Sequence, residues 1–482
     1  MGPHHRELRF DMSMDGAHRP ANVIWVITDQ MRAQATGYAG DPNVFTPNLD
    51  RLAAEGANFT RAVSGAPLCC PFRGAMVTGR YPHNNGVTGH GDPLPDGSLT
   101  VAHAFRDAGY RTCYIGKWHL DGNSPERGSV MPGDDIRHRM IPPERRGGFE
   151  DWWAYENGNQ PFDCIIHTDK GGTPQGVPVL DSADGMEHFR VPGFEADGLT
   201  DILLGWLGTQ VADRPEQPFF AVLSMQPPHN PYTAPAEAMA RHTPGDVRLR
   251  PNVPDIRDVT ERARRDLAGY YAGIEQIDDN VGRIRASLDE LGLTENTYLV
   301  FFSDHGDMHG SHGQWRKTGP WEESIRIPFL IGGPSREHQN SNRPDVPVNH
   351  VDIAPTSLGL CGLPVPAQME GTDYSAVVTT PGIRPPVWDG PPDSAYLGIP
   401  VAPRHPQSVG QAWRGIVTRD NWKYACFEGQ PWLLFNLDDD PYEFVNLAHD
   451  PAYYAIRAGL HERLRQWADQ TGDTFDLPAL ER

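Results

Sequence analysis

Long apolar runs are missing from this sequence. No segment approaches the roughly 18 apolar residues that a membrane-spanning helix requires. Residues 1–20 carry histidines, arginines and acids where a secretory signal would carry an apolar stretch. We therefore expect a flexible leader over residues 1–20, a cytoplasmic location and no membrane partner.

Basic residues are also in short supply. The chain has 42 lysines and arginines against 63 aspartates and glutamates, which gives a net charge of −21 at pH 7. Such an excess of negative charge opposes nonspecific binding to nucleic acid or to an anionic membrane. An anionic substrate would have to meet cations that are concentrated locally.

Cysteines are few and scattered. The six lie at positions 69, 70, 113, 164, 361 and 426 without paired metal-ligand spacing, which argues against a disulfide framework or a zinc site. The 482 residues exceed the roughly 250–300 that one core accommodates, so we expect two unequal domains. A stretch rich in proline and glycine at 381–392 predicts a boundary between a catalytic domain at 21–380 and a smaller subdomain at 381–482.

What the sequence does contain is a series of short, apolar, β-rich runs that end abruptly in polar residues. Buried parallel strands have this pattern, and open α/β sheets place ligands at the carboxyl ends of such strands. We expect four such strands, each followed by candidate site residues. They are 22–27 before Asp29 and Gln30, 112–115 before Lys117 and His119, 218–225 before His229, and 297–302 before Asp304 and His305.

The polar residues at these strand ends can act together. Asp304 and His305 are adjacent hard and borderline ligands, and with Asp29 they could hold a divalent cation. Lys117 and His119 lie two apart, so in an extended chain their side chains would face one pocket. His229 stands among prolines and titrates near neutrality, as a proton donor or acceptor must.

The remaining pattern predicts two further regions. Apolar spacing indicates a long helix over about 259–291, and short strands at 395–397, 414–418, 422–427 and 433–436 precede a helix at about 452–470. Residues 121–198 lack sustained periodicity, so we expect a substrate-facing insertion there. Its candidate leaving-group residues are Arg145, Arg146, Trp152, Trp153, Tyr155, Glu156 and Asn157.

The stretch from Ala66 to Gly89 organises the rest of the chain. Pro71 fits the first position of a short helix, and Gly79 fits its end. Cys69 would then lie at a helix N-terminus, where free N–H groups and the helix dipole favour an anion or a reactive sulfur. Arg73, one turn inside, adds a planar cation.

The run Cys69-Cys70-Pro71-Phe72-Arg73, followed by Thr78-Gly79-Arg80, resembles the active-site motif of the type I sulfatases. Segments 46–56, 116–120, 227–232 and 321–328 resemble the same family in the same order. The resemblance covers residues 22–473. It implies an alkaline-phosphatase-like α/β fold, with a large mixed, mostly parallel sheet flanked by helices and a small C-terminal antiparallel sheet with one helix.

The resemblance also implies a chemistry. In that family the cysteine two residues before the proline, here Cys69 and not Cys70, is oxidised by a formylglycine-generating enzyme, and the hydrated aldehyde is the nucleophile. The implied substrate is an aryl or carbohydrate sulfate monoester. The implied catalytic residues are Cys69, Arg73, Lys117, His119, His229 and Lys317. The implied metal ligands are Asp29, Gln30, Cys69, Asp304 and His305, around calcium or, as the alternative, manganese.

Individual roles follow from the same resemblance. Arg73, Lys117 and Lys317 would bind the sulfate, and His229 or Lys317 would protonate the departing alcohol. His119 would assist the formylglycine hydrate.

Two departures from the family pattern leave alternatives open. Asp29-Gln30 stands where many sulfatases have Asp-Asp, and Asp304-His305 where many have Asp-Asn. Asp-His occurs in relatives that include phosphonate monoester and phosphodiester hydrolases with the same aldehyde, which is the first alternative function. Two others keep Cys69 as a thiol, in a Cys–His hydrolase or in a non-catalytic binding protein.

Overall fold

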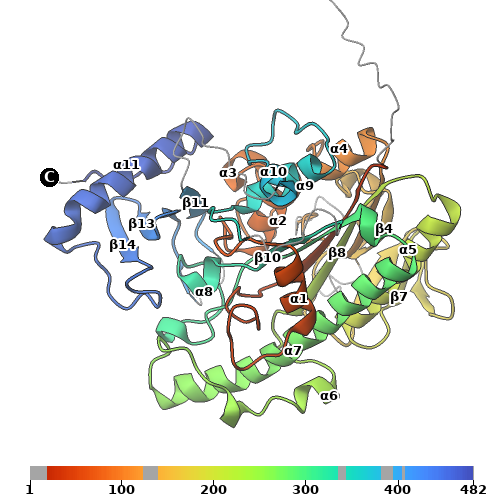
Figure 1. The fold of residues 1–482 in the computed structure, drawn as a ribbon, viewed down its shortest axis with the longest axis horizontal. Helices are drawn as coiled ribbons and strands as arrows, with labels where there is room; N and C mark the ends of the chain where they lie inside the picture. Colours follow the sequence, from red (N-terminus) through yellow and green to blue (C-terminus); the bar gives the residue numbers. More distant parts are fainter. Residues whose placement is uncertain (1–18, 123–138, 335–342, 381–393, 404–407, 481–482) are drawn as a thin grey trace, which may run out of the picture.

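One large sheet with helices on both faces makes the body of the protein (Figure 1). The computed structural model describes residues 19–122, 139–334, 343–380, 394–403 and 408–480. The ten-stranded sheet has the order β2-β10-β9-β1-β8-β3-β4-β5-β7-β6, and a second sheet has the order β11-β12-β13-β14. The predicted α/β architecture with a small second sheet is confirmed. The predicted leader and the boundary at 381–392 lie outside the described residues, apart from the last two residues of the leader.

The centre of the large sheet is parallel, and both of its edges are antiparallel. The parallel strands are β9 (Thr297–Ser303), β1 (Asn22–Asp29), β8 (Phe219–Pro228), β3 (Arg111–Lys117) and β4 (Asp151–Tyr155). The antiparallel strands are β10 (Phe329–Gly332) and β2 (Ala57–Asn58) at one edge, and β5 (Ile165–Thr168), β7 (Glu187–Arg190) and β6 (Val179–Asp181) at the other.

Alternate side chains of β1 enter two different cores. Val23, Trp25 and Ile27 pack on one face, and Ile24 and Val26 pack on the other. The first face is covered by α2 (Cys69–Thr78), α4 (Val101–Asp107), α9 (Ile353–Leu360) and α10 (Ser375–Thr379), and the second by α1 (Pro47–Glu55), α5 (Glu195–Asp213) and α7 (Arg257–Glu290). Short helices are α3 (Pro82–Asn85), α6 (Ala236–Met239) and α8 (Glu322–Ile325). Burial from both sides explains why the central strands are continuously apolar.

The predicted substrate-facing insertion is largely wrong. Among its described residues, β4 pairs with β3 in parallel, and β5, β7 and β6 continue the sheet from there. These strands are only three to five residues long, so they show little period-2 pattern. Most of this segment is therefore the edge of the sheet.

The C-terminal subdomain consists of β11 (Ser394–Ile399), β12 (Trp413–Thr418), β13 (Trp422–Phe427), β14 (Gln430–Asn436) and α11 (Tyr454–Thr471). Lys423 anchors it to the main body, since its fully buried ammonium group lies 2.7 Å from carboxylate oxygens of both Glu322 and Glu443. Trp413 donates a 2.8 Å hydrogen bond to the Thr318 carbonyl, and the Thr318 hydroxyl donates to the Val409 carbonyl. The subdomain thus holds the loop next to Lys317.

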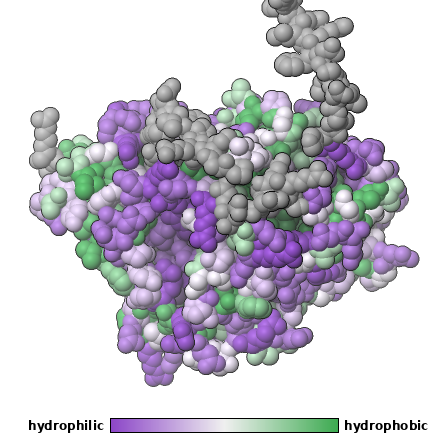
Figure 2. Space-filling model, in the orientation of Figure 1, coloured by the Kyte–Doolittle hydropathy of each residue, from purple (hydrophilic) through white to green (hydrophobic). Residues whose placement is uncertain are grey.

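The surface is consistent with the acidic, polar composition. On the face shown in Figure 2, hydrophilic residues prevail and hydrophobic ones are scattered among them. Within the described ranges, no helix combines the length and apolar character needed to cross a lipid bilayer.

A buried carboxylate ties the end of the chain to the small sheet. Asp473 accepts hydrogen bonds from Arg414 Nε at 2.6 Å and Nη2 at 3.0 Å, and from the Tyr396 hydroxyl at 2.7 Å. Burial alone would raise the pKa of Asp473, but Arg414 and Tyr396 outweigh it and lower this pKa to about 2. The ionised carboxylate therefore stabilises the subdomain.

We expect Asp473→Asn to lower the free energy of unfolding by about 2 kcal/mol at pH 7. Because the folded-state pKa is depressed, this contribution is present above about pH 4 and is lost as the pH falls through about 2. Urea titrations of both proteins at several pH values measure it. The wild-type advantage should shrink between pH 4 and pH 2, and an advantage that stays constant there would contradict the linkage.

Candidate active site

Helix α2 presents Cys69 at its first position. Leu68 precedes the helix in an extended conformation, and every residue of the helix is buried. Pro71 is the third helical residue, not the first as predicted. The missing N–H of proline still costs nothing there, because the first four N–H groups of a helix have no intrahelical partner. Gly79 ends the helix at φ 64° as predicted, and its N–H donates to the Ala75 carbonyl.

Cys69 and Cys70 have opposite surroundings. Cys69 Sγ lies 3.2 Å from Lys317 Nζ and 3.3 Å from His305 Nε2, and it donates to Asp29 at 3.8 Å. Cys70 Sγ accepts the Gly91 N–H and is packed in the core. Of the two neighbours, Cys69 is the one that faces the predicted site.

The charges around Cys69 favour its ionised form. Burial and Asp29 would each raise the pKa of the Cys69 thiol, but Lys317, Lys117 and His305 together lower it. Burial raises the pKa of Cys70. The thiol position of Cys69 is therefore an anion-stabilising point, which also suits an oxygen nucleophile that would replace the sulfur.

The ends of strands β1 and β9 and the start of helix α2 together form a candidate metal centre. Ligand atoms of Asp29, Cys69, Asp304 and His305 all lie within 4.8 Å of one another, and all four residues are buried. Asp304 Oδ2 is buried without a hydrogen-bond partner among the described residues. Two carboxylates, an imidazole and the Cys69 position form a donor set that suits a divalent cation.

Cations surround these carboxylates. Lys117 Nζ lies 2.6 Å from Asp29 Oδ2, and Arg73 lies 3.7 Å from Asp29 and 3.6 Å from Asp304. Burial would raise the pKa of Asp29, but Lys117, His229 and Lys317 hold it well below its usual value. Burial would lower the pKa of Lys117, and Asp29 raises it. Both members of the buried pair are therefore charged near neutrality.

Gln30, which follows Asp29 at the end of β1, contacts Lys317. Its side-chain oxygen accepts a 2.9 Å hydrogen bond from Lys317 Nζ, and its amide nitrogen donates to Asp307 at 2.6 Å. Asp307 also accepts from the Tyr232 hydroxyl. Gln30 thus positions Lys317 beside Cys69, and its role as a metal ligand stays a prediction.

A cavity of about 370 Å³ opens over Cys69. Its described lining includes five of the predicted residues, Cys69, Lys117, His119, His229 and Lys317. Arg73 lies beneath it, donating hydrogen bonds to the Lys117 carbonyl and the Ser224 hydroxyl. The strand ends therefore converge as the sequence predicted.

Two histidines of this cavity, His119 and His229, are held neutral. Burial and Lys117 keep the pKa of His119 well below its usual value, and burial and Lys317 do the same for His229. Neither ring nitrogen of His119 has a hydrogen-bond partner among the described residues. The chain at His119 is left-handed, at φ 58°, and not extended as predicted, yet it still faces the cavity with Lys117.

Of the predicted leaving-group residues, Asn157 is the one that lines the cavity. The other six make contacts within the protein. Arg146 pairs with Asp169, and Arg145 pairs with Asp121. Trp152 donates to His167, Trp153 to the Gly172 carbonyl and Tyr155 to Glu195, while Glu156 accepts the Asp121 and Gly122 amides. Their aromatic and charged character reflects packing.

Sequence reasoning missed several residues of the lining. These are Leu68, His90, Asn159, Arg316, Thr318 and Pro403. Arg316 could have been found from its position beside Lys317. The others come from turns and from the C-terminal subdomain, where no local pattern marks them.

Comparison with protein families decides the assignment. A family model described as Sulfatase matches residues 21–363. The chain belongs to the sulfatase family. A second model, described as N-sulphoglucosamine sulphohydrolase, C-terminal, matches residues 310–470 of the same chain. Family membership identifies the protein as a sulfuric ester hydrolase.

Individual members of the sulfatase family resemble the chain along most of its length. The Ulvan-active sulfatase of Formosa agariphila is 35% identical over 457 residues, which cover 94% of this chain and 82% of that protein. The Endo-4-O-sulfatase of Bacteroides thetaiotaomicron is 30% identical over 394 residues, covering 73% and 72%. The yidJ structure from Bacteroides fragilis superposes with a TM-score of 0.81 at 28% identity, covering 96% and 99%.

Proposed function

We propose that this enzyme hydrolyses a sulfate monoester of a carbohydrate, using formylglycine made from Cys69 and a divalent cation. The observation that carries the proposal is the convergence of Cys69, two lysines, two neutral histidines and a buried carboxylate cluster on one cavity. Two relatives whose names specify ulvan and endo-4-O sulfate support the choice of a carbohydrate. A formylglycine-generating enzyme is then a required partner.

The two added groups would supply what the encoded residues lack. Formylglycine at position 69, once hydrated, would supply an oxygen nucleophile where Sγ now lies. A divalent cation held by Asp29, Asp304 and His305, with Gln30 as a further candidate ligand, would supply positive charge for a sulfate oxygen. Calcium and manganese both remain candidates for this set of ligands.

The protein's own side chains bind the sulfate and move the protons. The ammonium groups of Lys117 and Lys317, with Arg73 behind them, offset the charge on the sulfate oxygens. A neutral His119 can accept a proton at position 69. A bound sulfate adds the negative charge that raises the pKa of His229, so that this imidazole or Lys317 delivers a proton to the departing alcohol oxygen.

Phosphonate monoester hydrolysis is the second candidate, and the Asp304-His305 pair favours it. His305 Nε2 lies 3.4 Å from Asp304 and 3.6 Å from Asp29, so it belongs to the cluster. One preparation should be assayed with a sulfate monoester and a phosphonate monoester of the same alcohol. Higher kcat/KM for the sulfate supports the proposal, and turnover of the phosphonate alone would overturn it.

The mass of the peptide containing Cys69 tests the nucleophile directly. Protein made in a host with the maturation enzyme should show the loss of mass that accompanies conversion of a thiol to an aldehyde. A fully retained thiol in active protein would exclude formylglycine and revive the Cys–His hydrolase. A fully retained thiol in inactive protein would favour a binding protein.

We expect Asp304→Ala to remove the bound metal and to lower kcat/KM by about 100-fold or more, since metal coordination is worth several kcal/mol in the transition state. Metal analysis of the purified protein measures occupancy independently of activity. The matched control is Asp278→Asn, a buried carboxylate that caps the first turn of α1. It should keep the metal, and equal metal content in Asp304→Ala and wild type would contradict the predicted centre.

A further inference from the structure

A second cavity lies between the main body and the C-terminal subdomain. It has a volume of about 660 Å³, and it shares no described lining residue with the cavity over Cys69. The main body contributes residues 33–34 and 38–43 after β1, 58–61 at the end of β2, 248–251 before α7, and residues in and just after α8. The subdomain contributes Asn421, Leu437 and Tyr442. Clefts of this volume between two domains commonly bind ligands.

Arginines dominate the charge of this cavity, which we call the arginine pocket. Arg61, Arg248, Arg250, Arg326 and Arg343 line it, against two acids, Asp41 and Glu322. The rest of the protein is strongly acidic, with a net charge of −21. The pocket is therefore a local concentration of positive charge, of the kind that attracts an anion.

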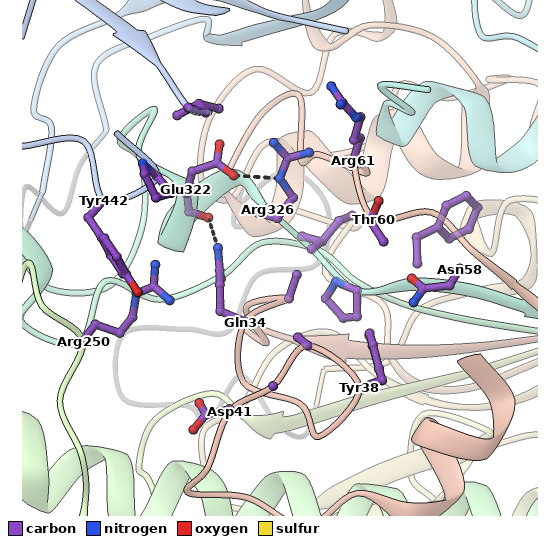
Figure 3. A pocket seen from close by; sticks show the side chains of 18 of the residues that line it. Gln34, Tyr38, Asp41, Asn58, Thr60, Arg61, Arg250, Glu322, Arg326 and Tyr442 are labelled. Atoms are coloured by element: carbon purple, nitrogen blue, oxygen red, sulfur yellow. Dashed lines mark hydrogen bonds and ion pairs between the residues drawn. The ribbon is translucent and has the colours of Figure 1, made fainter. Parts of the chain in front are cut away.

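Three of the arginines form ion pairs through Nε with neighbouring acids. Arg326 Nε pairs with Glu322 at 2.8 Å, Arg250 Nε with Glu323 at 2.7 Å, and Arg61 Nε with Asp345 at 2.6 Å. Figure 3 shows Arg326 between Glu322 and Arg61, with Arg250 beside Tyr442 at the other end of the pocket. For Arg250 and Arg326 this pairing through Nε leaves the outer edge of the guanidinium for a second partner, whereas Arg61 Nη1 already donates to Asn421 at 2.8 Å.

In Arg326 one of the outer nitrogens lacks a second partner among the described residues. Its side chain is about nine-tenths buried, and Nη1 is shielded from solvent without a hydrogen-bond partner among the described residues. Buried charged donors are normally satisfied, because an unmade bond to a charged group costs more than one to a neutral group. Arg248 and Arg343 add exposed cations that pair with no described acid.

We propose that the arginine pocket binds an anionic carbohydrate, with a sulfate or carboxylate against Arg326, at a site separate from the ester hydrolysed at Cys69. Tyr38, Tyr271 and Tyr442 supply aromatic surface, and Asn58 and Gln34 add polar groups to the lining, as sites for sugars do. The choice of an anion rests on the arginines. The choice of a carbohydrate rests on the proposed function.

The test uses the full chain carrying Cys69→Ala, so that binding is measured without turnover. Calorimetric titration with a sulfated hexasaccharide should show binding at both cavities. The double variant Arg248→Glu/Arg343→Glu should weaken one of these binding events by roughly tenfold or more, because it reverses two exposed cations of the pocket. Arg326 is left intact, so the ion pair with Glu322 is preserved.

The matched control is Arg106→Glu/Arg214→Glu. It makes the same change in net charge at two exposed arginines outside both cavities that pair with no described acid. Retained affinity in the control and loss in the pocket variant supports the proposal. Equal affinity in the two variants would overturn it.

Two further arms separate the sources of binding. If inorganic sulfate occupies the pocket as tightly as the hexasaccharide does, the carbohydrate part of the proposal is wrong. The unsulfated hexasaccharide should bind far more weakly, and equal binding would remove the role of the arginines. Turnover of a small aryl sulfate by the pocket variant with Cys69 present should equal wild type. A failure of the proposed function would appear instead as no sulfate turnover in either protein.

Discussion

Replacing Cys69 with alanine is expected to lower kcat/KM for a sulfate monoester by about 10³–10⁶-fold, the range found when a covalent nucleophile is removed. The alanine has no thiol to be oxidised to the aldehyde, while the two lysines and the other proposed metal ligands stay in place. Substrate binding should survive, so the loss should fall on kcat. Single-turnover kinetics together with binding of an inert sulfated sugar would show this division.

Cys70→Ala is the matched control. Cys70 is fully buried one position along the same helix, and it accepts the Gly91 N–H instead of facing the cavity. Its loss should cost stability through a small void, and the folded fraction should keep the activity of the wild type. If Cys70→Ala were the inactive variant and Cys69→Ala the active one, the assignment of the nucleophile would be wrong.

Replacing Lys117 with methionine should lower kcat/KM by about 100- to 1,000-fold, the cost of losing one charged donor to an oxyanion. It should also destabilise the protein by about 3–5 kcal/mol when the metal is removed, because Asp29 keeps a buried charge without its 2.6 Å partner. Restoring the cation should recover part of this stability. Chemical unfolding with and without chelator measures that difference.

Lys423→Met separates catalysis from stability. Lys423 is as buried as Lys117 and lies 2.7 Å from two carboxylates, but it belongs to the contact between the subdomain and the main body. It should destabilise the protein by a comparable amount while the folded fraction keeps its kcat/KM. Equal losses of kcat/KM in both folded variants would make Lys117 a structural residue only.

The sequence predicted best those features that local pattern determines. The apolar runs that end at Asp29, Lys117, His229 and Asp304 are strands β1, β3, β8 and β9, and their parallel pairing alone brings these residues to one edge. Residues that follow separate apolar runs in the sequence therefore lie close together in the structure.

Features that depend on contacts between segments distant in the sequence were not predicted. Strand β5 joins β4, and β6 joins β7, through only two residue pairs each, and ladders this short carry little sequence signal. Pro71 was misplaced by two positions because the apolar Leu68, and not a polar cap, precedes the helix, which begins at Cys69. Pro403 and His90 reach the cavity from segments more than 300 residues apart in the sequence, so no local spacing could relate them.

The attachment of Thr318 to Val409 and Trp413 has a consequence for the timing of synthesis. The loop that carries Lys317 is fixed by residues that leave the ribosome about a hundred residues later, so the site stays incomplete while most of the chain is being made. Cys69, 2% exposed in the finished protein, is out of reach of a modifying enzyme once α2 is packed. If Cys69 is converted to formylglycine as proposed, the modifying enzyme must act between the emergence of the cysteine and the packing of α2, and folding itself ends that period.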